Sequence, residues 1–270
     1  MSRLAARFDA LKARNESALI CFVTAGDPPG DRTVEVVNEI ARAGADAVEI
    51  GLPFSDPLAD GPSIQASSQR ALESGMTTVK ALALVKRIRE ANPDLPLVLM
   101  TYYNPIRHYG LARYAGDAKA AGADAHIVTD LTPEEAGEWK QHSVANGMDT
   151  VFLLAPTSTL ERIKVVATLS TGFLYCVSRT GVTGARQDVP TEVIDVVGRI
   201  RAQTTVPICV GFGVSTPQHV RNLCAFADGA VVGSALVDLI HNNRDHPDLL
   251  PRVHDYVAAL KTGTIPASQG

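Results

Sequence analysis

Three carboxylates lie in one short stretch of the chain, where an apolar run gives way to a proline-rich loop. Glu49 belongs to the apolar run over residues 47–50, and Asp56 and Asp60 follow in the loop over residues 51–62. A charged side chain in a buried strand costs free energy unless it is paired or used. We predict that Glu49 and Asp60 form an acid/base pair. An ion pair between Glu49 and an arginine, and turn or capping roles for the two aspartates, are the alternatives.

Two glycine-containing segments near the C-terminus could hold an anion. Residues 211–215 (GFGVS) and 233–235 (GSA) each follow an apolar run and precede a helical pattern. Small residues let backbone N–H groups approach an anion, and a helix N-terminus adds about half a positive charge. The two segments together predict a phosphate site, and hence a phosphorylated substrate, with ordinary tight turns as the alternative. A polar loop over residues 179–187, with two glycines and two threonines, predicts a mobile lid; a plain surface loop is its alternative.

Other residue types narrow the chemistry that the two acids serve. The seven lysines fall in predicted helices or in the C-terminal tail, which argues against a Schiff-base aldolase. The seven histidines are scattered along the chain, so we predict no metal site. The remaining possibility is that carboxylates alone act on a phosphorylated substrate, through proton transfer with carbon–carbon or carbon–oxygen rearrangement.

The elements that position these residues follow a pattern that repeats eight times. Short continuous apolar runs are typical of strands covered on both faces, and here they alternate with helical patterns, which indicates a parallel barrel. The predicted strands are residues 18–24, 47–50, 95–102, 124–130, 149–154, 172–178, 206–211 and 228–232. The predicted helices are residues 2–15, 32–43, 77–91, 111–121, 133–146, 160–169, 191–202, 217–225 and 249–260.

We therefore predict the fold class as α/β, a single (β/α)8 TIM-barrel domain over residues 1–270 with an extra N-terminal helix. The loops after strands 2 and 6 are extended, because predicted strand starts there lie 48 and 34 residues apart, against roughly 30 for a plain βαβ unit. Active sites of such barrels lie in the loops after strands. An open doubly wound sheet is the alternative, but it needs a GxGxxG motif that the TAGDP segment at 24–28 does not provide.

Composition limits the classes of function. The 270 residues are 46% hydrophobic and 20% charged, with a formal charge of −4, and no clustered basic residues indicate a nucleic-acid partner. No apolar run approaches the about 20 residues of a membrane span, and the amphipathic stretch over residues 2–15 is interpreted as a helix of the mature protein. The four cysteines form no CxxC pair and are interpreted as reduced core residues of a cytoplasmic protein.

Six segments spread over nearly the whole chain match one known family. They are FVTAGDP (22–28), EIGLPFSDPLADGPSIQ (49–65), YYNPI (102–106), SRTGVTGAR (178–186), GFGVS (211–215) and ADGAVVGSALV (227–237). In this order they resemble the tryptophan synthase alpha chain family. The resemblance implies cleavage of indole-3-glycerol phosphate to indole and glyceraldehyde 3-phosphate, with no cofactor in this chain. It also implies a beta-chain partner in an alpha2beta2 tetramer, which receives the indole and uses pyridoxal phosphate to join it to serine.

The resemblance also assigns residues, each by its position in this sequence. It implies catalytic roles for Glu49 and Asp60. It implies substrate-binding roles for Phe22, Tyr102, Tyr175 and Phe212 around the indole, for Thr183 closing over Asp60, and for Gly184, Gly213, Gly233 and Ser234 at the phosphate. It places Pro53, Asp56 and Asn104 at the beta-chain interface. The sequence departs from the family at residues 126–133 (HIVTDLTP), where the family usually reads closer to V-P-D-L-P.

In the implied mechanism the indole ring accepts the electrons of the broken bond. Glu49 protonates ring carbon C3, Asp60 accepts the ring N–H and stabilises the cationic indolenine, and loss of the glycerol hydroxyl proton releases the aldehyde. Three other functions remain open at this point. They are an indole-releasing lyase that works without a beta chain, a barrel isomerase acting on another sugar phosphate, and an idle barrel that activates or caps the beta subunit.

Overall fold

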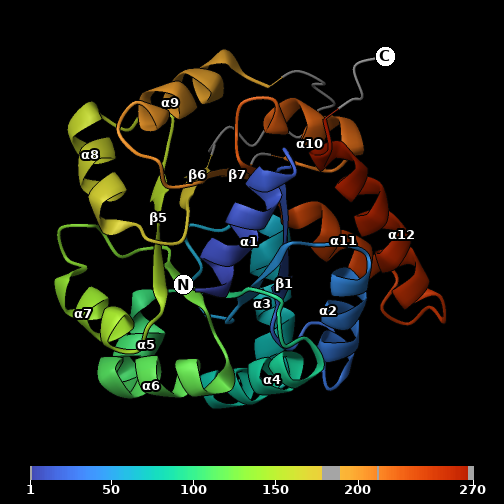
Figure 1. Cartoon of the computed structure of the whole chain (residues 1–270). Helices are drawn as coiled ribbons and strands as arrows, with labels where there is room; N and C mark the ends of the chain where they lie inside the picture. The colour runs from blue at the N-terminus through green and yellow to red at the C-terminus, as the bar shows by residue number, and fades with distance from the viewer. Residues whose placement is uncertain (1, 178–188, 212, 267–270) are drawn as a thin grey trace.

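Eight short parallel strands close into a barrel in the computed structural model, which describes residues 2–177, 189–211 and 213–266 (Figure 1). Each strand pairs with the next along the chain, and the last pairs with the first. The strands are β1 (Ala18–Thr24), β2 (Ala47–Gly51), β3 (Leu97–Thr101), β4 (Ala125–Val128), β5 (Asp149–Leu154), β6 (Leu174–Val177), β7 (Ile208–Gly211) and β8 (Gly229–Val232). The predicted TIM barrel and its eight strands are confirmed. The strand predicted over 95–102 begins only after Pro96, which has no N–H for strand pairing.

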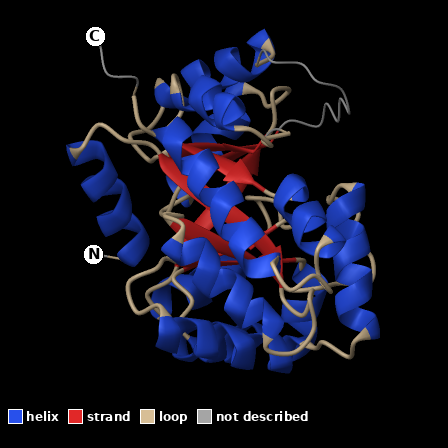
Figure 2. Ribbon diagram, turned by 90° about the vertical axis from the view of Figure 1, so that its right-hand side faces the viewer, coloured by secondary structure: helices blue, strands red, loops and turns tan. Residues whose placement is uncertain are grey.

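Helices follow the strands and surround the barrel (Figures 1 and 2). They are α1 (Arg3–Ala13), α2 (Arg32–Arg42), α3 (Pro62–Glu73), α4 (Thr78–Ala91), α5 (Tyr103–Tyr109), α6 (Leu111–Ala121), α7 (Gly137–Ala145), α8 (Leu160–Leu169), α9 (Thr191–Arg201), α10 (Pro217–Cys224), α11 (Ser234–Asn242), α12 (Leu249–Lys261) and the short 3-10 helix η1 (Thr262–Thr264). Within the described residues, no helix has both the length and the apolar character needed to cross a membrane.

Three helices have no counterpart among the predicted ranges, namely α3, α5 and α11, although the sequence predicts a helical pattern after the glycine at 233; a fourth helix is shorter than predicted. The long segment after β2 holds α3, whose buried residues are Ser67, Ser68 and Ala71, so it has no stripe of large apolar side chains to signal a helix. Helix α5 has only seven residues. Helix α7 begins at Gly137, because residues 131–136 form turns where the prediction for residues 133–146 has helix.

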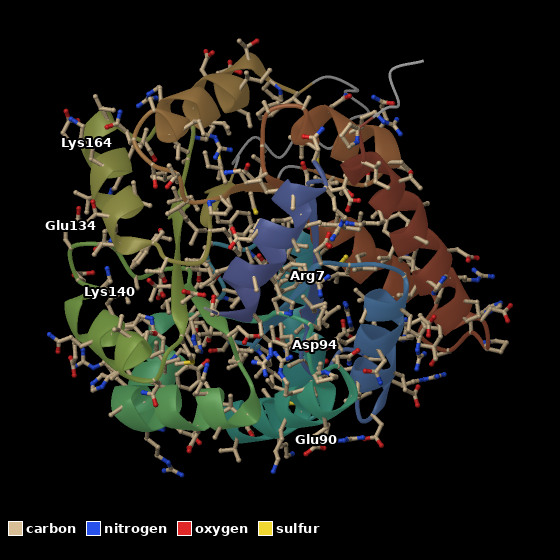
Figure 3. The ribbon with its side chains drawn as sticks, viewed as in Figure 1. Arg7, Glu90, Asp94, Glu134, Lys140 and Lys164 are labelled. Atoms are coloured by element: carbon tan, nitrogen blue, oxygen red, sulfur yellow. The ribbon has the colours of Figure 1, made fainter. Side chains whose placement is uncertain are left out.

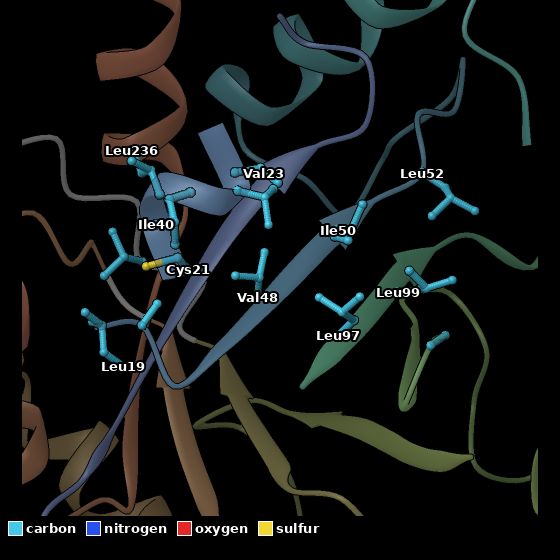
Figure 4. Packing of buried hydrophobic residues seen from close by; sticks show 14 of the residues in the cluster. Leu19, Cys21, Val23, Ile40, Val48, Ile50, Leu52, Leu97, Leu99 and Leu236 are labelled. Carbon is cyan, nitrogen blue, oxygen red and sulfur yellow. The ribbon is translucent and has the colours of Figure 1, made fainter. Parts of the chain in front are cut away.

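The strands bury side chains on both faces, as continuous apolar runs predict. Residues that point outward pack beneath the helices. Figure 4 shows this layer for β1, β2 and β3, where Val23, Ile50 and Leu99 lie in one cluster with Ile40 of α2 and Leu236 of α11. A second cluster lies inside the barrel and along α1; it comprises Leu4, Phe8, Leu11, Ala18, Ile20, Ala47, Val98, Ala125, Ile127, Val151, Phe173, Cys209 and Val231.

Helix α1 covers the end of the barrel at which the strands begin. Its apolar face is buried against the barrel interior, and the rings of Phe8 and Phe173 have centroids 6.2 Å apart. Figure 2 shows α1 beside the N-terminus, on one side of the strands and apart from the surrounding helices. Figure 3 shows Arg7 on this helix, while Glu90, Glu134, Lys140 and Lys164 lie at the periphery of the view. The extra helix therefore leaves only the opposite end of the barrel open.

Three aspartates hold neighbouring strands together at the end of the barrel that α1 covers. Each lies just before a strand, and its carboxylate accepts a backbone N–H from the start of the neighbouring strand. The bonds are Leu19 N–H to Asp46 at 2.8 Å, Leu97 N–H to Asp124 at 2.9 Å and Ile208 N–H to Asp228 at 2.7 Å. Each carboxylate also has a cation, namely Lys261 and Arg7 for Asp46, Arg3 and Arg89 for Asp124, and Arg201 for Asp228.

Candidate active site

Glu49 lies on the interior face of β2, toward the open end of the barrel. Side chains alternate along a strand, so Glu49 shares the interior face with Ala47 and Gly51. It is 1% exposed, and its Oε1 atom has no hydrogen-bond partner among the described residues. Burial raises the pKa of this carboxyl to about 8. No described arginine or lysine pairs with it, so the structural ion pair considered as an alternative is absent from the described part of the chain.

Asp60 lies in the loop after β2 and is partly buried. Burial raises the pKa of its carboxyl to about 6, and a hydrogen bond from the Tyr102 hydroxyl acts in the opposite direction. That hydroxyl also accepts the Ala59 N–H at 2.9 Å, which holds the loop against the end of β3. The Gln65 side chain of α3 donates to the Asp60 carbonyl at 2.8 Å. Asp60 is therefore fixed in place by groups on both sides of its loop.

A small pocket opens beside Asp60. Its lining residues are Phe22, Gly51, Leu52, Asp60, Ile64, Ser68, Met100, Thr101 and Tyr102. The wall combines apolar and aromatic side chains with the Asp60 carboxyl and three hydroxyl groups, so it offers both ring contacts and hydrogen-bond partners. Glu49 lies beneath this pocket, two residues before Gly51 and in register with Phe22.

Two glycines at strand ends make room for aromatic rings, and the sequence analysis did not single out this role. A Cβ atom on Gly51 would lie 2.5 Å from the Phe22 ring, and one on Gly211 would lie 2.5 Å from the Tyr175 hydroxyl. Tyr175 is in β6; burial raises its pKa well above the usual range, and so, to a lesser degree, do Glu49 and Asp60. The structure therefore brings three of the predicted substrate-binding aromatic residues, Phe22, Tyr102 and Tyr175, to the surroundings of the two acids.

The residues predicted to bind phosphate are described only in part. Gly213 has φ of +47°, a conformation that favours glycine, and Gly233 immediately precedes α11, which begins at the exposed Ser234. The first N–H groups of a helix have no partner within it, so α11 presents donors at this position. Thr183, Gly184 and Phe212 lie outside the described residues.

The residues predicted to face a partner lie together on the rim of the open end. Pro53 and Asp56 are in the loop after β2, and Asn104 is exposed on α5. The rings of Phe54 and Tyr102 have centroids 5.2 Å apart, so the loop contacts the end of β3. Leu58 is 91% exposed at the tip of the same loop.

The described side chains do not form a metal site, since no group of three or more histidines, cysteines, aspartates or glutamates is placed to hold an ion. Aromatic and small side chains surround the two acids. This arrangement can hold an apolar ring and move protons at two positions, one reached from β2 and one from the loop above it.

Comparisons with known proteins agree with this geometry. The family model for the tryptophan synthase alpha chain matches residues 8–264. The alpha chains of Geobacter sulfurreducens and Geotalea uraniireducens are 52% and 49% identical, covering 97% of this chain and 98% of each relative. Among solved structures, the alpha subunit of Legionella pneumophila has a TM-score of 0.91 at 33% identity, covering 98% of both chains. A chain of Mycobacterium tuberculosis tryptophan synthase has a TM-score of 0.91 at 36% identity, covering 98% and 99%. Since family model, relatives and structures agree over nearly the whole length, the chain belongs to the tryptophan synthase alpha chain family.

Proposed function

We propose that this chain cleaves indole-3-glycerol phosphate to indole and glyceraldehyde 3-phosphate, with Glu49 and Asp60 as the acid/base pair. The observation that carries the proposal is a buried carboxyl without a cation, directly beneath an aromatic pocket that contains a second carboxyl. The elevated pKa values, about 8 for Glu49 and about 6 for Asp60, give the two groups different protonation states at neutral pH. One is a proton donor and the other is an anion.

Glu49 begins the reaction as a neutral acid. It gives its proton to ring carbon C3, and the ring becomes a cationic indolenine. The resulting Glu49 carboxylate then accepts the proton of the glycerol hydroxyl next to C3. As that C–O bond becomes a carbonyl, the carbon–carbon bond breaks and its electron pair restores the aromatic indole. The proton balance is closed, because Glu49 ends the cycle as it began.

Asp60 acts on the opposite edge of the ring. Its carboxylate accepts a hydrogen bond from the ring N–H, and that bond strengthens as positive charge develops on the ring nitrogen. Tyr102 donates to the same carboxylate and keeps it oriented. Gly213, Gly233 and Ser234 hold the phosphate, and the N-terminus of α11 supplies donors for it. The roles of Thr183, Gly184 and Phe212 in substrate binding rest on the family resemblance alone.

The partner is a tryptophan synthase beta chain, which carries pyridoxal phosphate and receives the indole. Pro53, Asp56 and Asn104 form the contact surface, and the exposed Leu58 gives the same rim an apolar point of contact. The loop that carries Asp56 also carries Asp60, so binding of the partner acts on the position of the acid. We place the protein in the cytoplasm, which its free cysteines, three of them buried, support.

One assay tests the proposal: indole release from indole-3-glycerol phosphate, measured with and without added beta chain. We expect release by the chain alone and a faster rate with the beta chain. A rate that the beta chain leaves unchanged supports a stand-alone lyase. Full indole formation by Glu49→Gln contradicts the mechanism. No indole from the wild type, with beta-chain activation intact in a Glu49→Gln, Asp60→Asn double variant, supports the idle barrel.

The same assay tests the division of roles within the loop. Asp56→Ala is expected to weaken activation by the beta chain more than it lowers basal cleavage, since Asp56 is exposed and is not one of the residues that line the pocket. An equal loss of both activities contradicts the assignment of Asp56 to the partner surface.

A further inference from the structure

The Asp60 carboxyl is presented to the pocket by a tight turn over residues 57–60. The Asp60 N–H donates to the Pro57 carbonyl at 3.1 Å, which closes the turn. Helix α3 begins directly afterwards, with Gly61 as its N-cap and Pro62 as its first residue. The conformation of this turn therefore decides where the Asp60 carboxyl lies.

The Gln65 side chain connects the two ends of this turn. Its Nε2 atom donates to the Asp60 carbonyl at 2.8 Å and, over a longer distance of 3.4 Å, to the Pro57 carbonyl. A side-chain amide carries two hydrogens, so one group serves both carbonyls. Side chains of a helix point back toward its N-terminus, and Gln65 is the fourth residue of α3. Its amide is therefore directed at the residues that precede the helix.

A different side chain holds the turn from the side of the barrel. The Ala59 N–H donates to the Tyr102 hydroxyl at 2.9 Å. Among the described residues, Tyr102 and Gln65 are the only side chains that bond the backbone of residues 57–60, and the Asp60 carbonyl has no donor other than Gln65. Tyr102 therefore fixes the middle of the turn, and Gln65 fixes the peptide group that follows Asp60.

Helix α3 is itself fixed to three other segments, namely β1, the loop after β1 and α11. Its side chains make a hydrogen bond or an ion pair with each of them. The bonds are Ser67 with Thr24 at 2.6 Å, Arg70 with Asp27 at 3.1 Å and 2.6 Å, and Ser63 with Asp238 at 2.9 Å. A side chain on a rigid helix holds a neighbouring group more precisely than one on a loop. Gln65 therefore connects the turn to a firmly held element.

We propose that Gln65 is a positioning residue of the alpha reaction, which acts on Asp60 through the backbone of the turn. The inference rests on the function proposed above. Asp60 has to meet the ring nitrogen as positive charge develops there, and such a hydrogen bond weakens steeply when donor and acceptor are misaligned. Because this contact strengthens in the transition state, a misplaced Asp60 lowers the rate of cleavage more than it weakens substrate binding.

The test uses the full chain and indole formation from indole-3-glycerol phosphate. Gln65→Met keeps the length of the side chain and removes both N–H donors. We expect kcat to fall about fivefold, as for the loss of one hydrogen bond, and KM to change by less than about twofold. Gln65→Glu places a carboxylate opposite two carbonyl oxygens, so we expect a larger fall in kcat than with methionine.

Gln69→Met is the matched control for a general effect on the helix. Gln69 lies one turn further along α3, is exposed as Gln65 is, and bonds Glu73 of the same helix at 2.9 Å. We expect this variant to keep the wild-type kcat and KM.

Hydrogen–deuterium exchange of the backbone amides of residues 57–60 gives a second measurement that does not depend on activity. Exchange should be faster in Gln65→Met than in the wild type, because the turn opens more often without the bond to the Asp60 carbonyl. Gln69→Met should exchange these amides at the wild-type rate.

The inference is overturned if Gln65→Met keeps the wild-type kcat, or if Gln69→Met lowers kcat by as much. It is also overturned if exchange within residues 57–60 is the same in Gln65→Met and in the wild type. Each of these results, with indole formed by the wild type, leaves the proposed function intact. A wild-type chain that forms no indole contradicts the proposed function itself.

Discussion

Buried carboxyl groups have opposite surroundings at the two ends of the barrel. At the end covered by α1, Asp46, Asp124 and Asp228 each accept a strand N–H and pair with lysine or arginine. At the open end, Glu49 meets apolar and aromatic side chains and has no described cation, and burial raises its pKa to about 8. The same chemical group is ion-paired at one end and has no described cation at the other.

The difference lies in what the chain places opposite each carboxyl. Helix α1 contributes Arg3 and Arg7 to the covered end, and residues from α4, α9 and α12 supply the remaining cations. The open end receives small residues, aromatic rings and the hydroxyl of Tyr102 instead. Paired carboxylates hold strands in register, while an unpaired one exchanges its proton. Variants at the two ends should therefore change different properties.

Glu49→Gln should have the largest effect, a loss of activity without a loss of stability. Loss of the general acid is expected to lower kcat about a thousandfold. Stability should rise, because the folded-state pKa of about 8 lies above the ordinary value of 4.5, so the wild type loses stability as pH rises between these values. The gain is on the order of 4 kcal/mol by pH 8. Indole assays and denaturant unfolding at pH 5 and pH 8 measure both effects. Lower stability at pH 8 would mean that the Glu49 carboxyl is paired after all.

Asp124→Asn should have the opposite outcome, a loss of stability without a loss of activity. It removes the charge that faces Arg89, whose side chain is only 12% exposed, and a buried cation without its anion costs about 3 kcal/mol. The kcat of the folded variant should not change. Asp149→Asn is the matched control, since Asp149 also begins a strand but has a carboxyl oxygen without a partner, and we expect a cost below about 1 kcal/mol. Equal losses of stability at Asp124 and Asp149 would show that the ion pairs of Asp124 contribute nothing to stability.

The pH dependence of kcat/KM should be set by the ionisation of groups at the open end only. Asp60 must be ionised and Glu49 protonated, so activity rises through about pH 6, falls above about pH 8 and changes about tenfold per unit outside that range. Asp124→Asn should give the same limbs, because its carboxyl lies at the other end. Steady-state assays across pH 5 to 9 test this. A profile without an alkaline limb would contradict the assignment of Glu49 as the proton donor.

The sequence predicts the barrel well because its strands carry a local signal. Continuous apolar runs identify all eight strands, and glycines such as Gly44 and Gly122, with φ near +100°, mark helix ends. The sequence misses α3, because this helix buries serine and alanine rather than large apolar residues. It also misses the ion pairs of the covered end. Asp46 and Lys261, for example, are 215 residues apart, and no local pattern relates them.

The site is predictable only where a residue is unusual in its own segment. Glu49 stands out as a charge within an apolar strand, and Asp60 follows it in a distinctive loop. The role of Gly51 does not stand out, because it depends on the Phe22 ring from a neighbouring strand.

Arg3→Gln should have the smallest effect and sharpens the comparison within the covered end. The Arg3 side chain is 44% exposed and bonds Asp124 at 2.9 Å, but Arg89 and the Leu97 N–H still hold that carboxylate when Arg3 is lost. We expect a cost of about 0.5 kcal/mol, seen as a Tm lower by about 1–2 °C, and a difference that shrinks in 1 M salt. Arg113→Gln, at an exposed pair on α6, is the control for a surface arginine. If Arg3→Gln costs as much as Asp124→Asn, then docking of α1, rather than the pairing with Arg89, stabilises the covered end.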